Sequence, residues 1–193
     1  MAKKLESTFK NMVLVLFTVT LIASSAVGVV YELTKTPIEQ AKQNKKLKAI
    51  KDVVPAFDNN PDADKYTVDL NGETLELYPA KQNGQLVGTA IKTFTTKGFS
   101  GKFWIMVGIK PDGTINNYSV LEHKETPGLG SKMGEWFKGE GKQSIINKNP
   151  LNTKFIVSKD GGDIDAITAA TISSRAFLDA IQKASNAYNK DLK

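Results

Sequence analysis

Small hydroxyl side chains are concentrated near the end of the chain, in the segment GGDIDAITAATISSRA at residues 161–176. A glycine turn that leads into a helix presents unpaired N–H groups at the positive end of the helix dipole, which favours a bound anion. One hydroxyl group, from Thr168 or Thr171, is enough to cap such a helix. The hydroxyl residues here, with one just upstream, are Ser158, Thr168, Thr171, Ser173 and Ser174. Two interpretations stay open: a capped helix, and an anion site in which hydroxyl groups assist the backbone donors.

The rest of the composition limits the chemistry that these hydroxyl groups can do. The chain has no Cys, which excludes iron–sulfur clusters, attached c-type haem, thiolate zinc sites and disulfides. It has a single His, His123, so a multi-histidine metal site within the chain is excluded as well. A nucleophilic hydroxyl needs a positioned base, and no His or Cys adjoins the hydroxyl segment. A redox role would therefore require an organic cofactor.

Two further glycine-rich turns could contribute to a binding site. In HKETPGLGSK, residues 123–132, Gly128 and Gly130 flank Leu129 and let the backbone approach a flat ligand closely. The second turn, KGFSGKFW at residues 97–104, leads into an apolar run. Taken singly, each turn is equally consistent with a plain loop beside a strand.

Strands must position these turns. Alternating apolar residues on both sides of Asn71 and Gly72 predict a β-hairpin, and Asn83 and Gly84 predict a second one. The continuous apolar run at residues 102–109 is typical of an interior strand. A turn at residues 111–113 leads into one more strand that ends near the glycine-rich loop.

Helices are expected at residues 131–139 and 171–190. Apolar residues of the second helix fall on one face with 4-3-4 spacing, at Phe177, Ile181, Ala184 and Tyr188. The predicted fold class is α+β, a mostly antiparallel sheet with packed helices, preceded by one N-terminal transmembrane helix.

The predicted transmembrane helix rests on residues 11–31, which carry no charge and lie between Lys10 and Glu32. Such a helix would extend roughly 30 Å, about one hydrocarbon core. A cleaved signal peptide is the alternative, because ASSA at residues 23–26 resembles a cleavage site. Apolar residues continue beyond that site, which favours a retained anchor.

Charge is distributed unevenly along the chain. The net charge of +6 lies entirely within residues 1–51, which hold nine Lys and three Glu. A basic excess beside an apolar segment favours anionic lipid headgroups over nucleic acid, although a solvated helix face explains it equally well.

A helix start is predicted just after the anchor. Thr36, Pro37 and Glu39 form a capping box, which indicates a separate stalk helix that ends near Pro55. The predicted organisation is an N-terminus at 1–10, a transmembrane helix at 11–32, a stalk and linker at 33–56, and a domain at 57–193. Charge leaves the side of the membrane open, and the resemblance described next implies a cytoplasmic N-terminus and an extracytoplasmic domain.

Three segments together resemble one family. DAITAAT at residues 165–171 resembles the flavinylation motif of the FMN-binding domain family, Asp-x-x-Ser/Thr-Gly/Ala-Ala-Thr, with Ala169 where the family more often has Gly. HKETPGLG and GFSG match two other motifs of that family in the same order. With its N-terminal anchor, the chain resembles the G subunits of Rnf complexes and the homologous, usually longer C subunits of the sodium-translocating NADH:quinone reductase.

This resemblance implies a cofactor and its attachment. FMN would be joined through its phosphate to the hydroxyl of Thr171 by a dedicated flavin transferase that uses FAD. The loop at residues 125–130 would lie against the isoalloxazine ring. The residues expected at the site are Ser100, Gly101, Glu125, Thr126, Gly128, Leu129, Gly130, Thr168, Ala170, Thr171, Ser173 and Ser174.

The resemblance also implies a role. We expect an electron-transfer subunit of a complex that couples ferredoxin:NAD electron flow to sodium or proton transport, with no catalytic site or metal of its own. Its partners would be integral membrane and iron–sulfur subunits, and we expect no binding to nucleic acid. The location would be the cytoplasmic membrane, with the main domain outside. The alternatives are a C-type component of the quinone reductase, another extracytoplasmic flavin carrier, and a membrane-tethered binding module without a redox cofactor.

Overall fold

The structure is a computed structural model that describes residues 6–191. Residues 1–5, part of the predicted cytoplasmic N-terminus, and residues 192–193 lie outside the described residues. The chain divides into two compact units, one up to Asn44 and one from Lys45 onward.

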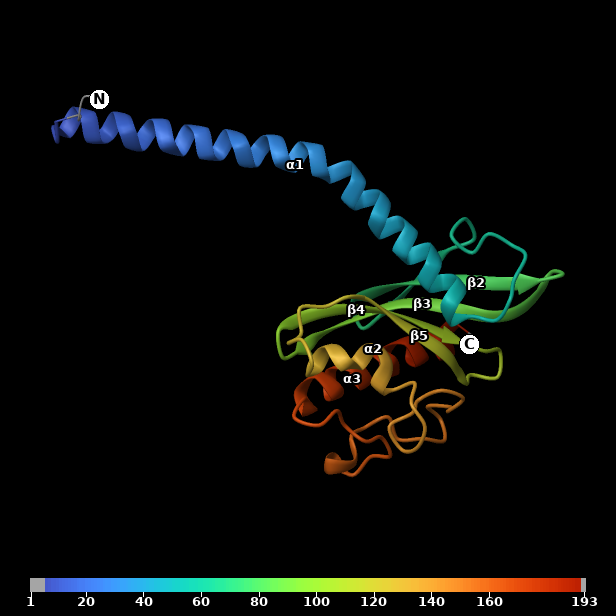
Figure 1. Ribbon diagram of the computed structural model, residues 1–193. Coiled ribbons are helices and arrows are strands. Elements are labelled where there is room, and N and C mark those ends of the chain that lie inside the picture. The colour runs from blue at the N-terminus through green and yellow to red at the C-terminus, as the bar shows by residue number, and fades with distance from the viewer. Residues whose placement is uncertain (1–5, 192–193) are drawn as a thin grey trace. The chain divides into compact units, whose positions relative to one another are not determined.

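From Phe9 onward, the first unit is part of a single long helix, α1 (Phe9–Val53), drawn in blue in Figure 1. This helix is long and apolar enough to cross a membrane, with a mean hydropathy of 2.5 in its most apolar window. Hydroxyl groups within the apolar stretch donate to carbonyl oxygens four residues earlier, as Thr18 does to Leu14 and Ser24 does to Thr20. Such internal bonds satisfy the hydroxyl groups without water.

The predicted helix start at Thr36 is wrong. Helix α1 runs through Thr36 and contains Pro37, so the anchor and the stalk form one helix. A proline inside a helix removes one hydrogen bond but does not oblige the helix to end. The end at Val53 agrees with the expected effect of Pro55, because a proline disfavours helical geometry in the residue before it.

Five antiparallel strands form the sheet of the second unit in the order β1-β2-β3-β4-β5. Both predicted hairpins are confirmed: Asn71 and Gly72 have φ of 56° and 83°, and Asn83 and Gly84 have φ of 51° and 78°. The apolar run at residues 102–109 lies in β4, an interior strand as predicted. The strands are β1 (Tyr66–Leu70), β2 (Glu73–Gln82), β3 (Gln85–Gly98), β4 (Gly101–Ile109) and β5 (Ile115–Glu122).

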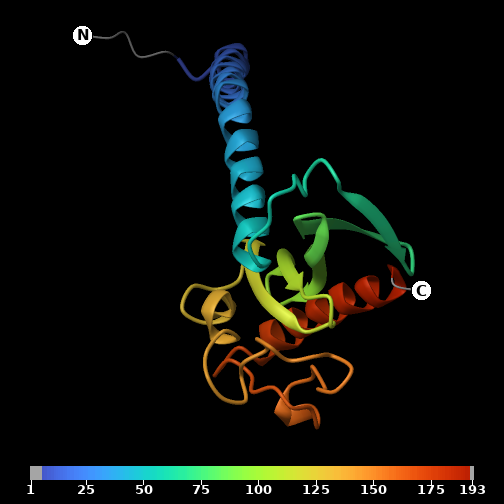
Figure 2. The ribbon, with the colours of Figure 1, turned by 90° about the vertical axis from the view of Figure 1, so that its right-hand side faces the viewer.

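Helix α3 (Thr171–Asp191) covers one face of the sheet, and the last turns of α1 cover the other (Figure 2). Alternation along β3 separates the two cores: Ile91 packs with the residues of α3, and Ala90 packs with Ile50 of α1. The α1 contact requires glycine at position 108, since a Cβ there would lie 1.8 Å from the Val53 carbonyl oxygen. The apolar stripe predicted for the last helix is buried, at Phe177, Ile181, Ala184 and Tyr188.

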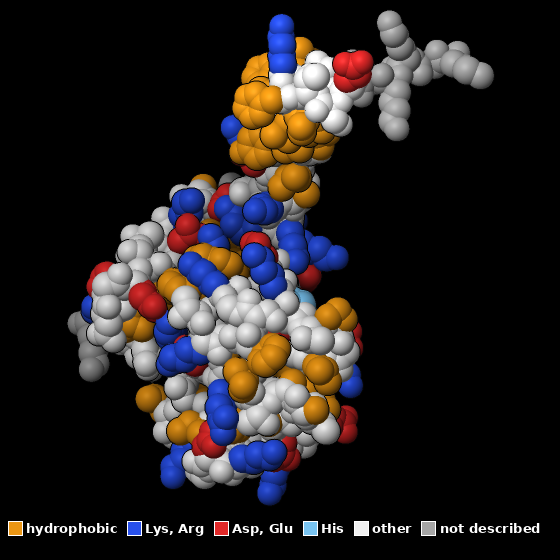
Figure 3. Space-filling view, turned by 90° about the vertical axis from the view of Figure 1, so that its left-hand side faces the viewer, with side chains coloured by type: hydrophobic (Ala, Val, Ile, Leu, Met, Phe, Trp, Pro, Cys, Tyr) orange, Lys and Arg blue, Asp and Glu red, His pale blue; other side chains and the backbone are white. Residues whose placement is uncertain are grey.

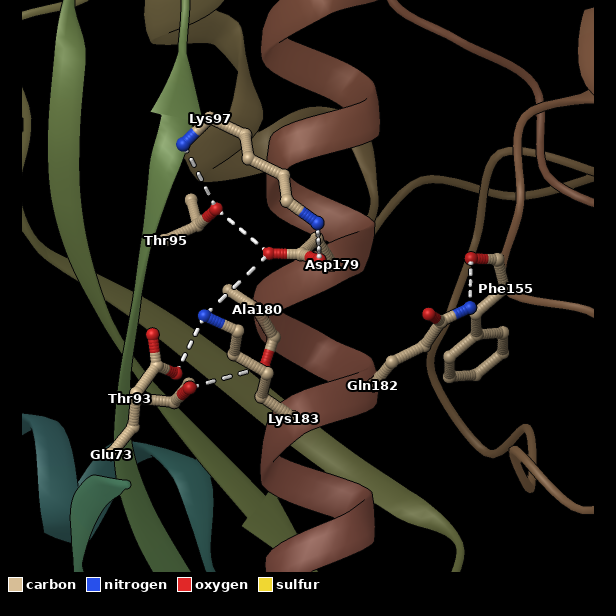
Figure 4. A network of polar contacts seen from close by, with 9 residues as sticks. All are labelled: Glu73, Thr93, Thr95, Lys97, Phe155, Asp179, Ala180, Gln182 and Lys183. Atoms are coloured by element: carbon tan, nitrogen blue, oxygen red, sulfur yellow. Dashed lines mark hydrogen bonds and ion pairs between the residues drawn. The ribbon is translucent and has the colours of Figure 1, made fainter. Parts of the chain in front are cut away.

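Polar contacts fix α3 against β3 (Figure 4). The Thr93 hydroxyl donates to the Ala180 carbonyl oxygen at 3.2 Å, and the Thr95 hydroxyl donates to Asp179 at 2.9 Å. Lys97 forms an ion pair with the same Asp179 carboxylate at 2.6 Å. These bonds lie within the first ten residues of α3, so they hold its start in register with the end of β3.

The segment between β5 and α3 is mostly irregular. The helix expected at residues 131–139 is present only as two short pieces, η1 (Gly130–Lys132) and α2 (Met133–Trp136). A further short helix, η2 (Ser158–Asp160), precedes the hydroxyl segment. Trp136 Nε1 donates to the Asp165 carbonyl oxygen at 3.0 Å, which links α2 to the turn before α3.

Candidate functional site

Three segments that are distant in sequence meet at one end of the sheet, on the left in Figure 1. They are the β3–β4 turn, the loop that follows β5, and the start of α3. They enclose a cavity of about 310 Å³. Its lining residues are Phe99, Glu125, Thr126, Leu129, Gly130, Ala169, Ala170, Thr171, Ile172 and Ser173. All three motifs that carry the family resemblance therefore contribute to one cavity.

The start of α3 leaves backbone donors open at this cavity. The Ser174 N–H donates to the Ala170 carbonyl oxygen at 3.0 Å. The N–H groups of Thr171, Ile172 and Ser173 donate to no acceptor within residues 6–191. A helix N-terminus with free N–H groups favours an anion through its donors and its dipole.

The turn before α3 is secured by Ser174, one of the hydroxyl residues expected at the site. The Ser174 hydroxyl accepts from the Ile167 N–H at 2.9 Å and donates to the Ala170 carbonyl oxygen at 3.0 Å. Neither Thr168 nor Thr171 provides the expected cap. Ser174 can do so because its side chain is fully buried against the turn, whereas Thr168 is exposed.

Ala169 has an unusual backbone. Its φ is 60°, in the left-handed region where a Cβ is unfavourable and glycine is preferred. This conformation turns the chain immediately before α3. It also gives a physical reason for glycine at the equivalent position of the motif that the sequence resembles.

Glu125 joins the three segments. Its side chain is only 4% exposed. The Ser173 hydroxyl donates to Glu125 Oε2 at 2.5 Å, and the Ser100 N–H donates to Oε1 at 2.9 Å. Gly130 packs against this pair so closely that a Cβ would lie 2.5 Å from Ser173 Oγ. Close packing within the protein therefore accounts for glycine at position 130.

The predicted site residues divide into three groups. Those that line the cavity are Glu125, Thr126, Leu129, Gly130, Ala170, Thr171 and Ser173. Ser100 touches the site through its backbone, Gly101 lies in the same turn, and Gly128 has a left-handed φ of 75° in the exposed loop. Thr168 and Ser174 do not line the cavity.

Phe99 and Ile172 line the cavity but were not predicted from the sequence, and Ala169, predicted as part of the motif, lines it as well. Phe99 and Ile172 are 67% and 49% exposed, and Leu129 is 40% exposed. Apolar side chains gather among lysines on this end of the domain in Figure 3. A large apolar residue inside a glycine turn, as in GFSG, is a signal that could have identified Phe99.

An ion pair lies one turn beyond Thr171. The Arg175 guanidinium donates to both carboxylate oxygens of Asp160, at 2.6 and 2.7 Å. This hydrogen bonding lowers the pKa of Asp160 below its usual value. Ser158 donates to Asp165 at 2.5 Å, so its hydroxyl belongs to the same turn. These bonds hold the segment before α3 in place.

In the part of the chain that the structure describes, no three acidic or His side chains group as a metal site.

Comparison with known proteins agrees with this geometry. Residues 98–186 match the FMN-binding domain family. A Vibrio cholerae serotype O1 (strain M66-2) protein, named as the G subunit of an ion-translocating oxidoreductase complex, is 35% identical over 173 residues, which cover 84% of this chain and 82% of the relative. The protein of the same name from Aliivibrio fischeri (strain ES114) is 34% identical over 189 residues, covering 92% and 89%. The chain thus belongs to the family of G subunits of ion-translocating oxidoreductase complexes and contains an FMN-binding domain.

Proposed function

We propose that the chain is a membrane-anchored electron carrier of an ion-translocating oxidoreductase complex and holds FMN through a phosphoester to Thr171. The observation that carries the proposal is the position of Thr171. It lines the cavity and begins α3, where backbone N–H groups are open. The ester phosphate keeps a negative charge, which the dipole and the donors of the helix start would stabilise.

The other hydroxyl groups of the site are less suited to carry the phosphoester. Ser173 already donates to Glu125, and Ser174 is buried in the turn. Thr168 is exposed and does not line the cavity. Thr126 lines the cavity but belongs to the loop after β5 and not to the first turn of α3. Among the described hydroxyl groups of the site, Thr171 alone combines access to the cavity, a place in the first turn of α3 and a hydroxyl that makes no hydrogen bond.

The other lining residues fit the remainder of FMN. The cavity has exposed apolar side chains, Phe99, Leu129 and Ile172, at its rim, which suit a flat aromatic ring and would limit its contact with water. The bound FMN would supply the redox chemistry. The protein residues would hold the phosphate, orient the ring and set its electrostatic surroundings.

Maturation would need a separate enzyme, because no group within residues 6–191 is hydrogen-bonded to the Thr171 hydroxyl to take its proton. A flavin transferase would move FMN from FAD to the hydroxyl, so that the Thr171 oxygen–phosphorus bond forms and AMP leaves. The modified chain would gain the mass of FMN less one water.

Substitution at Thr171 tests the attachment. The full chain is coexpressed with a flavin transferase, and denatured bands are examined for flavin fluorescence and intact mass. Thr171→Ala should lose covalent flavin and keep its fold, since the Thr171 hydroxyl makes no hydrogen bond within the described residues. Thr168→Ala and Thr126→Ala should keep the flavin. Fluorescence retained by Thr171→Ala would show that attachment is elsewhere.

The anchor and its orientation belong to the same proposal. Residues 11–32 of α1 would cross the cytoplasmic membrane and place residues 57–193 outside, where integral membrane and iron–sulfur subunits of the complex are the expected partners. Electron flow from ferredoxin to NAD would drive sodium or proton transport through the assembly. The chain would contribute the flavin relay.

The absence of Cys from the sequence allows a clean test of orientation. Single Cys residues are introduced at two exposed positions, Lys142→Cys in the domain and Ser7→Cys before α1. A membrane-impermeant maleimide applied to intact spheroplasts should label Lys142→Cys strongly and Ser7→Cys only after lysis. The reverse pattern would place the domain in the cytoplasm.

A further inference from the structure

Glu125 is a buried carboxylate with an unusual set of neighbours. Its side chain is 4% exposed and lines the cavity. Buried acidic groups are ordinarily paired with a cation, because removing a charge from water is costly. Within residues 6–191, however, no Lys, Arg or His forms an ion pair with Glu125.

Hydrogen-bond donors take the place of the cation. Oε1 accepts from the Ser100 N–H at 2.9 Å, and Oε2 accepts from the Ser173 hydroxyl at 2.5 Å. Both partners are donors, as an ionised carboxylate requires. Ser173 also belongs to the first turn of α3, whose positive dipole end favours a nearby negative charge.

Close packing keeps this carboxylate in place. A Cβ at Gly98 would lie 2.7 Å from Oε1, and a Cβ at Gly130 would lie 2.6 Å from Oε2. The β3–β4 turn and the loop after β5 thus pack directly against the two carboxylate oxygens. The negative charge is fixed at the cavity wall, where water screens it poorly.

We propose that Glu125 is an electrostatic tuning residue that lowers the reduction potential of the bound FMN. Reduction adds electrons to the flavin ring, and a fixed negative charge beside the ring opposes that added negative charge. The inference rests on the proposed location of FMN in this cavity. Glu125 would exchange neither electrons nor protons with the ring; it would act through its field alone.

A purely structural role is the competing explanation. Glu125 bonds to two of the segments that line the cavity, so it could serve only to hold them together. The two roles differ in what the charge itself does. A structural link affects stability and flavin loading, whereas an electrostatic role shifts the potential of flavin that is already bound.

The test is a potentiometric titration of the flavin-loaded full chain in detergent, with dithionite as the reductant and visible absorbance as the signal. Glu125→Gln keeps the size and removes the charge. Its amide oxygen can accept from the Ser100 N–H, and its amide nitrogen can donate to the Ser173 hydroxyl, which then accepts. The substitution should shift the potential of the flavin to a more positive value. Glu140→Gln removes the same charge from an exposed position and should shift it much less.

The Ser173→Ala variant provides an independent test in the same titration. It keeps the Glu125 charge but removes one donor that compensates it, so the potential should shift to a more negative value. Equal potentials for Glu125→Gln and Glu140→Gln, or a positive shift for Ser173→Ala, would overturn the inference. A wild-type chain that never acquires flavin would overturn the proposed attachment and, with it, this inference. A flavin-loaded chain in which Glu125→Gln leaves the potential unchanged would overturn this inference alone.

Discussion

At the scale of single residues, the site depends on backbone conformation as much as on side-chain chemistry. Ala169 turns the chain with φ at 60°, and the next residues leave their N–H groups open at the cavity. A sequence pattern identifies the hydroxyl groups of such a segment but not which one stays free. Ser173 and Ser174 are both engaged within the protein, by a loop and a turn that sequence spacing does not bring together.

Ala169→Gly should stabilise the domain. Glycine adopts the left-handed conformation without the steric cost that Cβ imposes, and the expected gain is about 1 kcal/mol. Urea unfolding of the full chain in detergent measures it. Ala166→Gly is the matched control, because Ala166 has an ordinary negative φ and glycine there should bring no gain. Equal effects of the two substitutions would contradict the strain assigned to Ala169.

At the scale of elements, local sequence signals predicted most of the sheet. The two Asn-Gly turns and the buried stripe of α3 were foreseen because short-range geometry determines them. The helix start at Thr36 was wrong, because a capping box is also compatible with the interior of a longer helix. The Glu125 contacts could not be foreseen, since they join residues 25 and 48 positions apart.

A cross-strand pair between β2 and β3 predicts part of the acid sensitivity. Glu76 lies opposite Lys92 and accepts hydrogen bonds from Tyr78 at 2.5 Å and Lys92 at 3.2 Å. Partial burial alone would raise the pKa of Glu76, but these two donors and nearby lysines outweigh it and lower the pKa. The resulting stabilisation is present above the pKa of an unfolded Glu, about 4.3, and is lost as the pH falls through the lower folded value.

Glu76→Gln should therefore lose about 0.5 kcal/mol of unfolding free energy at neutral pH and show a weaker decline on acidification. Urea unfolding at a series of pH values from about 7 to 3 measures both effects. Glu140→Gln, at an exposed position, should follow the wild type. A Glu76→Gln curve parallel to that of the wild type would show that the pair contributes no acid sensitivity.

At the scale of the whole molecule, the chain joins a helix able to cross a membrane to a domain whose cavity is lined by residues of three motifs. Composition and residue spacing alone predicted an anchored domain with a possible anion site. The resemblance supplied the cofactor and the attachment residue, and the structure adds the contacts that leave Thr171 free and Glu125 buried. Family membership agrees with this arrangement over most of the chain length.

Peptide mapping tests the central proposal most directly. Trypsin should release residues 160–175, between Lys159 and Arg175, as one peptide that carries Thr168, Thr171, Ser173 and Ser174 together. Fragmentation of that peptide from the flavin-loaded chain should place the added mass of FMN less one water on Thr171. The same mass on any other hydroxyl group, or a wholly unmodified peptide from a chain matured with its transferase, would contradict the account.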